Sequence, residues 1–328
     1  ATFEIFALLV IIAVSAFWIR RNIIRIRRFL KPEMKGWPKN DADYILYIEL
    51  VLMFLFLTMN ASDYWLQHHP EAQSYYIQAG HFPISGLFTP LFDGMSYTTV
   101  VTIERTSWWL HIIGILAFLN YLYYSKHLHI IFAFPNTFYA NLNPLGRFSH
   151  SEAVANEVKL MMDPSADPYP SLAVEGEPIS FGAADVKDLN RIQLMNAYSC
   201  TECGRCTDVC PANQTGKKLS PRKIMMDTRD RLEQVGKQLD RGLEVDDKTL
   251  LDHHISREEL WACTTCNACV EACPISIDPL SIIMDMRQYL VMEQSSAPSE
   301  LNTMMTNIEN NGAPWPFNQQ DRINWINE

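Results

Sequence analysis

Hydrophobic residues are concentrated in the first 135 positions of the chain, in three long runs. The runs cover about residues 5–24, 44–66 and 106–134. Each is close to the ~20 residues that a helix needs to cross a bilayer. The remaining sequence has shorter apolar stretches among many charged residues and is typical of an acidic soluble domain. The pattern therefore predicts a mainly α-helical protein, with a transmembrane helix bundle followed by a soluble helical domain.

Basic residues are distributed unevenly around these runs. The loop between the first and second runs is rich in lysine and arginine, whereas residues 67–104 contain neither. The three apolar runs predict three crossings of the cytoplasmic membrane. Because basic loops stay in the cytoplasm, we expect the amino terminus on the outer side and the carboxyl-terminal domain on the cytoplasmic side. A signal peptide fits less well, because the basic residues follow the first run instead of preceding it. The basic residues are Arg20, Arg21, Arg25, Arg27, Arg28, Lys31 and Lys35.

All eight cysteines lie in two short windows with the same spacing. Both windows match the C-x2-C-x2-C-x3-C-P run that binds [4Fe–4S] clusters in two-cluster ferredoxins. In that run the first three thiolates hold one cluster and the fourth ligates the other. This predicts one cluster on Cys200, Cys203, Cys206 and Cys273, and a second on Cys263, Cys266, Cys269 and Cys210.

Zinc and disulfides are the alternative uses of so many cysteines. Zinc sites generally pair two C-x2-C units and have no need of four cysteines within eleven residues. Disulfides belong to oxidising compartments, and no cysteine is left over outside the two windows. The spacing therefore favours two [4Fe–4S] clusters.

The segments that follow the two cysteine windows are repeats of each other. Residues 221–229 and 279–287 share the pattern P-x-x-I-x-M-D-x-R. Proline is well tolerated at the first position of a helix, so each repeat is predicted to begin a helix. Each half of the domain is then a cysteine loop followed by a helix. The charged insert at about 230–258 separates the halves and favours a largely helical form of the dicluster ferredoxin fold.

These features divide the chain into four parts. We expect a membrane domain at 1–135, a linker at 136–185, a dicluster ferredoxin-like domain at 186–295 and an irregular tail at 296–328. The tail carries Trp315, Phe317 and Trp325 beside prolines and a glycine. Large aromatic side chains are unfavourable to leave in water, so the tail is predicted either to dock onto a partner subunit or to fold back on its own domain.

The repeat, the helical insert and the tail resemble the small iron–sulfur subunit of heterodisulfide reductase. They are also similar to the iron–sulfur portions of anaerobic glycerol-3-phosphate dehydrogenase and of glycolate oxidase. These families exchange electrons with a cysteine-rich CCG domain. Because no cysteine follows Cys273, the resemblance implies that such a domain is supplied by a soluble oxidoreductase partner.

Histidines in the third apolar run suggest a further cofactor. His111 and His129 are 18 residues apart, which is five turns of a continuous helix, about 27 Å along one face. His127 would face the other way. The stretches from Trp108 to His111 and from Ser125 to His129 resemble the paired-histidine helix of the nitrate reductase gamma subunit family, which binds b-type haem and uses quinols.

The resemblance is incomplete, because that family has more crossings and places opposing histidines on a second helix. The first two apolar runs contain no histidine. Three alternatives stay open: a haem with ligands from this chain, a haem with ligands from a partner, and no haem. In the last case His111 would be a packing residue, and His127 and His129 would be interfacial residues.

Three polar residues interrupt the second and third apolar runs. Polar groups within a membrane are functional candidates by default. We expect Asn60 and Asn120 to join helices through hydrogen bonds. Glu49, near the cytoplasmic end of its run, is a candidate for quinone binding or proton transfer.

Together these observations predict a membrane electron-transfer subunit. It would connect membrane quinone, through haem if present, with a soluble oxidoreductase by way of the two clusters. The alternative is a non-redox anchor that docks a ferredoxin module into a larger respiratory complex. The net charge of −10 argues against nucleic acid as a partner, and no catalytic residue beyond the cofactors is identified.

Overall fold

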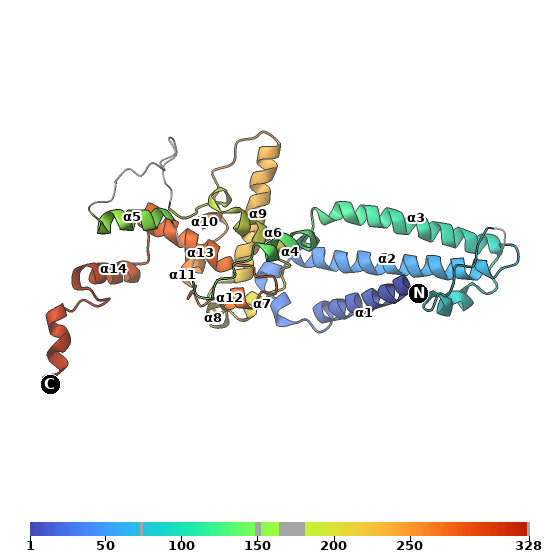
Figure 1. Cartoon of the computed structure of the whole chain (residues 1–328), viewed down its shortest axis with the longest axis horizontal. Coiled ribbons are helices and arrows are strands. Elements are labelled where there is room, and N and C mark those ends of the chain that lie inside the picture. The colour runs from blue at the N-terminus through green and yellow to red at the C-terminus, as the bar shows by residue number, and fades with distance from the viewer. Residues whose placement is uncertain (73–74, 148–151, 164–180, 327–328) are drawn as a thin grey trace. The chain divides into compact units, whose positions relative to one another are not determined.

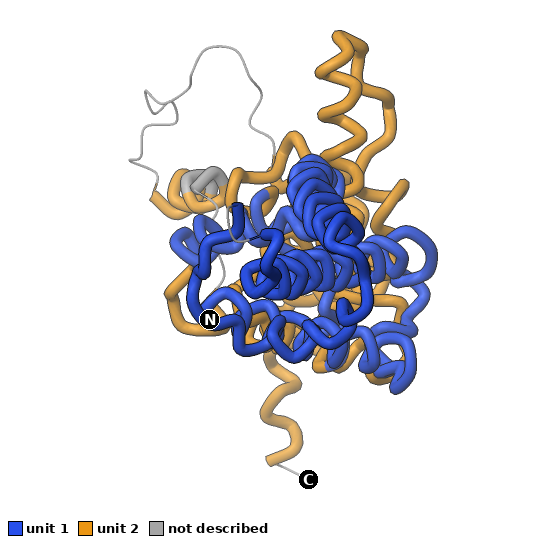
Figure 2. Tube along the Cα trace, turned by 90° about the vertical axis from the view of Figure 1, so that its right-hand side faces the viewer, with its two compact units in different colours: residues 1–140, 195–208 blue, residues 141–194, 209–328 orange. Residues whose placement is uncertain are grey.

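The computed structural model describes residues 1–72, 75–147, 152–163 and 181–326 (Figure 1). These residues form helices and turns, with one isolated β-bridge between Leu251 and Ile255. The predicted mainly α-helical class is confirmed. The chain forms two compact units, residues 1–140 with 195–208 and residues 141–194 with 209–328 (Figure 2). The segment that contains the first three cysteines thus belongs to the same unit as the long apolar helices.

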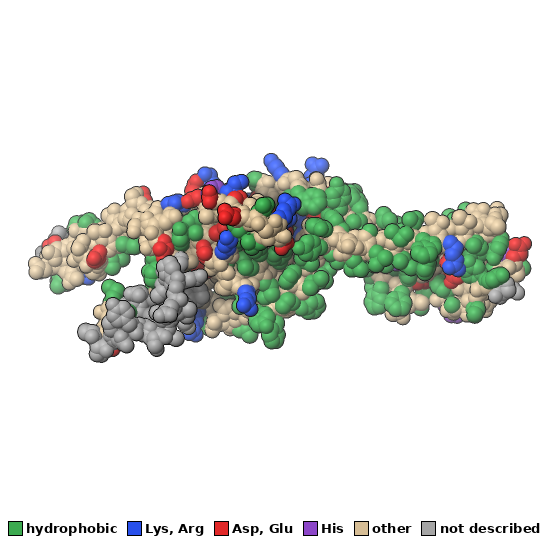
Figure 3. All heavy atoms as spheres, turned by 90° about the horizontal axis from the view of Figure 1, so that it is seen from above, with side chains coloured by type: hydrophobic (Ala, Val, Ile, Leu, Met, Phe, Trp, Pro, Cys, Tyr) green, Lys and Arg blue, Asp and Glu red, His purple; other side chains and the backbone are tan. Residues whose placement is uncertain are grey.

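Three long helices form most of the first unit and lie side by side (Figure 1). They are α1 (Thr2–Asn22), α2 (Trp37–Gln67) and α3 (Tyr97–Leu122), and α2 packs against both of the others. Many of their large apolar side chains remain exposed, and Figure 3 shows hydrophobic side chains along this part of the molecule. Such helices need an apolar surrounding, which a bilayer provides. Short helices η1 (Arg27–Phe29), η2 (Pro32–Met34) and η3 (Ser85–Phe92) lie in the connections.

Two of the three predicted crossings have the length and hydropathy of a membrane span. These are α1 and α2, and α3 does not reach the same hydropathy. Its first half carries threonines, Glu104 and Arg105, which shorten its apolar part. A third crossing by α3 therefore stays a prediction.

The third apolar run is not one helix. Helix α3 ends at Leu122, a short helix η4 follows at Lys126–Leu128, and α4 begins at His129 and ends at Phe138. The side chain of Ser125 accepts a hydrogen bond from the His127 backbone N–H at 3.1 Å and so caps η4. The prediction of a continuous helix over 106–134 is wrong because this cap starts a new helical segment.

Polar contacts at both ends fix α1 against α2. At one end the Asn60 amide donates to the Glu4 carboxylate at 3.4 Å. At the other end the Trp18 indole N–H donates to the Tyr47 hydroxyl at 3.0 Å. The two helices are therefore antiparallel, and Asn60 joins helices as predicted. Asn120 instead donates to the Leu116 carbonyl of its own helix.

The second unit is built around α9 (Pro221–Asp240) and α13 (Pro279–Gln288), which pack against each other. Both begin with the predicted proline, and side chains cap both starts. Ser220 accepts from the Lys223 N–H, and Asp278 accepts from the Ser281 N–H at 3.0 Å. The repeat thus has the helical form that the sequence predicted.

Shorter helices complete the second unit. They are α5 (Glu152–Met162), η5 (Val186–Asp188), α8 (Pro211–Gln214), α10 (Leu250–His253), α11 (Arg257–Trp261), α12 (Ala268–Glu271) and a π-helix η6 (Tyr289–Glu293). Helix α6 (Arg191–Ser199) contains residues of both units. The described part of the dicluster domain is therefore largely helical, as the charged insert predicted.

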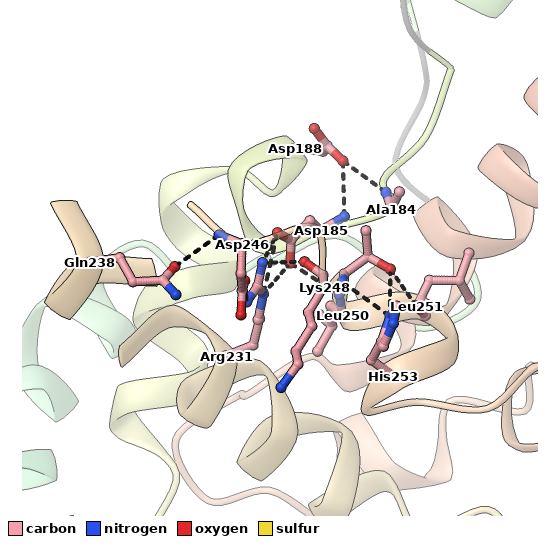
Figure 4. Close-up of polar contacts among 11 residues, drawn as sticks. Ala184, Asp185, Asp188, Arg231, Gln238, Asp246, Lys248, Leu250, Leu251 and His253 are labelled. Atoms are coloured by element: carbon pink, nitrogen blue, oxygen red, sulfur yellow. Dashed lines mark hydrogen bonds and ion pairs between the residues drawn. The ribbon is translucent and has the colours of Figure 1, made fainter. Parts of the chain in front are cut away.

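A buried arginine holds the charged insert to the rest of this unit (Figure 4). The Arg231 side chain has no exposed surface and bonds two carboxylates, at 2.9 Å to Asp185 and 2.6 Å to Asp246. It also donates to the Lys248 carbonyl. Asp185 in turn accepts from the Leu250 N–H at 3.0 Å. The hydrogen bond from Arg231 holds the pKa of Asp246 below its usual range.

The tail is more regular than predicted. Helix α14 covers Ser299–Asn311 and ends at Gly312, whose φ of 62° suits the left-handed residue that commonly terminates a helix. A 3-10 segment, η7, covers Gln319–Ile326. Trp315, Phe317 and Trp325 remain 47%, 64% and 74% exposed, so these aromatics do not fold back into a core. The linker predicted at 136–185 lies partly outside the described residues.

Candidate functional site

The two cysteine loops have the same backbone conformation. In each loop the second and fourth residues after the first cysteine adopt a left-handed conformation, at φ values between 55° and 75°. These are Glu202 and Gly204 in the first loop, and Thr265 and Asn267 in the second. Residues other than glycine seldom adopt this conformation. Alternating left-handed residues turn successive N–H groups inward and form nests that bind anions, including iron–sulfur clusters.

A hydrogen bond to sulfur supports this use of the second loop. The Thr265 N–H donates to the Cys263 sulfur at 3.4 Å. A hydrogen bond of this kind stabilises a thiolate and tunes the potential of a cluster that the thiolate binds. The backbone of both loops therefore suits a negatively charged cluster.

Four thiols of the second unit lie near one another. Burial raises the pKa of Cys269 to about 12, and the neighbouring thiols of Cys263, Cys210 and Cys266 contribute to the shift. Burial likewise raises the pKa of Cys263, again with Cys210 and Cys266 as neighbours. None of the eight cysteines forms a disulfide. Since thiols must lose their protons to bind metal, a cluster here would replace those protons.

Within the described residues, no three Cys, His, Asp or Glu side chains converge on a single-ion position. The expectation of metal at the cysteines therefore depends on two other observations. One is the spacing of the thiols along the chain, which is that of a two-cluster ferredoxin. The other is the pair of left-handed positions in each loop, which aim backbone donors at a bound anion.

Arg287, the last residue of the second repeat, holds the second cysteine loop in place. Its guanidinium donates to the carbonyls of Leu260 at 2.5 Å and Cys263 at 2.6 Å. It also lies over the Trp261 ring, 4.9 Å from its centre. The sequence pattern marked Arg287 as part of the repeat but gave no role for it.

A buried ion pair joins the first cysteine loop to the long helices. Lys126 of η4 pairs with Glu202, and both side chains are less than a tenth exposed. The Lys126 ammonium also donates to the Pro38 carbonyl at 2.5 Å, and its backbone N–H donates to Asp41 at 3.0 Å. Asp41 further accepts from the Tyr121 hydroxyl at 2.5 Å. The loop between Cys200 and Cys206 is therefore fixed to the adjoining ends of α2 and α3.

A cavity of about 800 Å³ opens beside this ion pair, within the first unit. Its walls come mainly from apolar residues of α1 and α2, and polar residues of η4 and of the first cysteine loop also line it. Glu49 and His127 face each other there, with 3.7 Å between the carboxylate and the imidazole Nε2. The polar and charged lining residues are Arg20, Arg21, Arg28, Glu49, Lys126, His127, His129, Thr201, Cys203 and Arg205.

The two histidines predicted to share a helix face lie on different helices. His111 lies on α3, and its Nδ1 is 3.0 Å from the Leu52 carbonyl. His129 begins α4, and its Nδ1 is 2.8 Å from the Lys126 carbonyl. The break between the helices removes the basis for a common face. His127, predicted to face away from the other two histidines, instead faces Glu49. The sequence signal of the break is Ser125, which caps the new helical segment.

A family profile described as "4Fe-4S dicluster domain" matches residues 199–277, which contain all eight cysteines. Residues 199–277 are a 4Fe-4S dicluster domain. The prediction of two [4Fe–4S] clusters is thereby confirmed at the level of the domain. The assignment of each cysteine to a cluster stays a prediction.

Longer relatives extend the comparison beyond the dicluster domain. The chain is 28% identical to the probable iron-sulfur-binding oxidoreductase FadF of Bacillus subtilis, over 99% of this chain and 46% of the relative. It is 26% identical to the EtfAB:quinone oxidoreductase of Syntrophomonas wolfei, over 92% of this chain and 43% of the relative. The chain thus spans less than half the length of these two relatives.

A third relative bears on the predicted resemblance. The chain is 31% identical to one of the subunits of the ferredoxin/F(420)H(2)-dependent CoB-CoM heterodisulfide reductase of Methanosarcina acetivorans, over 34% of this chain and 56% of the relative. The resemblance to an iron–sulfur subunit of heterodisulfide reductase is confirmed, and with it an iron–sulfur electron-transfer role for the dicluster domain. No solved structure matches the chain significantly.

Proposed function

We propose that the chain passes electrons between a membrane quinone and a soluble oxidoreductase partner through two [4Fe–4S] clusters. The observation that carries this proposal is the cavity beside the first cysteine loop. Cys203 lines the same cavity as Glu49 and His127, and the Lys126–Glu202 pair fixes that loop to the apolar helices. A proposed cluster ligand, Cys203, and two side chains that can carry protons, Glu49 and His127, thus line the same largely apolar cavity.

The clusters would supply one-electron transfer, while the chain holds and tunes them. We assign one cluster to Cys200, Cys203, Cys206 and Cys273, and the other to Cys263, Cys266, Cys269 and Cys210. The closeness of Cys210 to the three thiols of the second loop supports the second set. The matching left-handed positions in the two loops support an equivalent arrangement for the first set.

The relatives support the two ends of this electron path. One is named a quinone oxidoreductase and another belongs to a heterodisulfide reductase. We infer a soluble iron–sulfur or CCG-domain oxidoreductase as the partner. The first cysteine loop lies at the same end of the helices as the basic residues, because α7 (Arg205–Asp208) packs against η1. Basic residues favour the cytoplasmic face, so we place the dicluster domain there.

We propose no haem ligands in this chain. The assignment of His111 and His129 as axial ligands depended on one continuous helix, and that helix ends at Leu122. His129 lines the cavity, whereas His111 does not.

Electron paramagnetic resonance of the full chain in detergent tests the proposed function. We expect a short-chain quinol to reduce at least one oxidised cluster. In the reverse experiment we expect the corresponding quinone to oxidise at least one reduced cluster. Dithionite reduction provides the control for total cluster content. A non-redox anchor would show clusters that dithionite reduces but that exchange no electrons with quinol or quinone, and this result would refute the proposal.

Truncation after Ser296 tests the docking of the tail. We expect both clusters to remain, because Trp315, Phe317 and Trp325 are exposed and the packed helices α9 and α13 precede the cut. The soluble partner should be lost when the complex is purified from membranes, since buried aromatics commonly dominate interface affinity. The matched control is Leu239→Ser, which removes an exposed apolar side chain of α9. Loss of the clusters on truncation would show instead that the tail belongs to the domain core.

A further inference from the structure

The cavity in the first unit has the properties of a small-molecule site. Its volume of about 800 Å³ lies within the ~300–1,000 Å³ typical of ligand pockets, which are mostly apolar with a few polar groups. The apolar walls come from α1 and α2, the two helices suited to span a bilayer. A hydrophobic ligand could therefore enter from the membrane. The apolar lining includes Val10, Val14, Phe17, Ile45, Leu46, Leu52 and Met53.

The polar groups of the cavity form a compact set. Glu49 and His127 are 3.7 Å apart, and the centre of the His127 ring lies 5.5 Å from those of His129 and Phe118. A carboxyl group and imidazoles can both donate and accept protons, and a flat ligand can pack against aromatic rings. Ionisable residues within a membrane domain are rare and usually functional.

We propose that this cavity binds the ring of a membrane quinone, with His127 and Glu49 as the groups that hydrogen-bond its oxygens and exchange its protons. The inference rests on the proposed function and assigns the site at which it takes place. Cys203 of the first cysteine loop also lines this cavity, so a proposed cluster ligand forms part of its wall. Proton and electron exchange would then occur at one bound ring.

The partner and the chain can supply the electrons and protons that the proposed quinone reaction needs. Reduction of a quinone to a quinol takes up two electrons and two protons. The electrons come from the soluble oxidoreductase partner, and the protons come from His127 and Glu49, which regain theirs from water. In the opposite direction the quinol gives up two protons to these side chains and two electrons to the partner.

A phospholipid is the competing occupant, because Arg20, Arg21 and Arg28 also line the cavity. Two contacts argue against a phosphate site. Arg21 is 3.6 Å from Asp43 and lies over the Phe29 ring at 4.8 Å, so it already has partners. The Glu49 carboxylate would repel a phosphate, whereas it can bond to a quinol hydroxyl.

Binding of a fluorescent hydroxyquinoline N-oxide, an analogue of a quinol, tests this site in the full chain in detergent. We expect Leu46→Trp, which fills the cavity, and His127→Gln, which removes a proton-exchanging group, to weaken binding at least tenfold. The matched controls are Leu110→Trp on an exposed position of α3 and His68→Gln at the exposed end of α2. Both controls should bind within twofold of wild type. The resonance spectra of the clusters should be unchanged in all four variants.

Three outcomes would overturn the assignment. Equal binding by all four variants, while quinol still reduces the clusters of the wild type, would leave the proposed function standing and refute this site. Co-purified phospholipid that is lost only from Leu46→Trp, with analogue binding unchanged, would assign the cavity to lipid. Absence of both analogue binding and quinol-driven reduction in the wild type would refute the site and the proposed function together.

Discussion

Replacement of Cys210 by serine will abolish the cluster of the second cysteine loop and leave the cluster of its own loop in place. In the C-x2-C-x2-C-x3-C-P run the fourth cysteine serves the other motif. The structure brings the Cys210 thiol near those of Cys263, Cys266 and Cys269, which agrees with this expectation. Because this cluster would then keep only three of its four thiolates, we expect its complete set of resonance signals to disappear.

The comparison that decides the matter uses two cysteines of one loop. Cys206 and Cys210 are four residues apart, yet their serine variants should affect different clusters. Cys210→Ser should reproduce the spectrum of Cys266→Ser, and Cys206→Ser should reproduce that of Cys273→Ser. If Cys210→Ser matches Cys206→Ser instead, each motif holds its own cluster and the crossed assignment is wrong.

Arg231→Met is expected to lower the stability of the dicluster domain by about 3–5 kcal/mol. The substitution keeps much of the side-chain volume but leaves the Asp185 carboxylate, which is 13% exposed, without its cation. Removal of one partner from a buried ion pair has this cost because the remaining charge is desolvated and uncompensated. The insert that contains Asp246 and Lys248 also loses its anchor. At ~2–4 °C for each kcal/mol, the apparent Tm should fall by about 6–20 °C.

Thermal loss of the cluster absorbance of the purified full chain measures this effect. The control is Lys237→Met on the same helix, where the ion pair with Glu233 is largely exposed. Exposed pairs contribute at most about 1 kcal/mol, so its Tm should stay close to that of the wild type. Adding Asp185→Asn to Arg231→Met should restore part of the loss, because it removes the orphaned charge. If Arg231→Met has the same apparent Tm as Lys237→Met, the buried network does not stabilise the domain.

Features with a fixed local spacing could be predicted from the sequence. The cysteine runs identified the dicluster domain, and the proline-headed repeat placed the starts of α9 and α13, because both signals lie within a few residues. The apolar runs likewise located α1 and α2. Glu49 was named as a candidate from its position within an apolar run.

Features that depend on tertiary contacts could not be predicted in this way. The apolar composition of the third run concealed the break after Leu122, so His127 was placed on the wrong face. Lys126 and Glu202 are 76 residues apart, and Arg231 and Asp185 are 46 apart. No sequence periodicity relates residues at such separations, so their pairing can be read only from the three-dimensional structure.

The Lys126–Glu202 pair has a consequence for how this protein is made. A soluble fragment that starts at the dicluster domain would keep Glu202 and lose its contact with Lys126, which lies in η4 before that domain. We expect such a fragment to assemble fewer clusters per polypeptide in a heterologous host than the chain with its helices, because a contact that fixes the first cysteine loop is missing. By the same reasoning, we expect cluster insertion to be more efficient once the helices are in the bilayer, because the Lys126–Glu202 pair then holds the first cysteine loop against them.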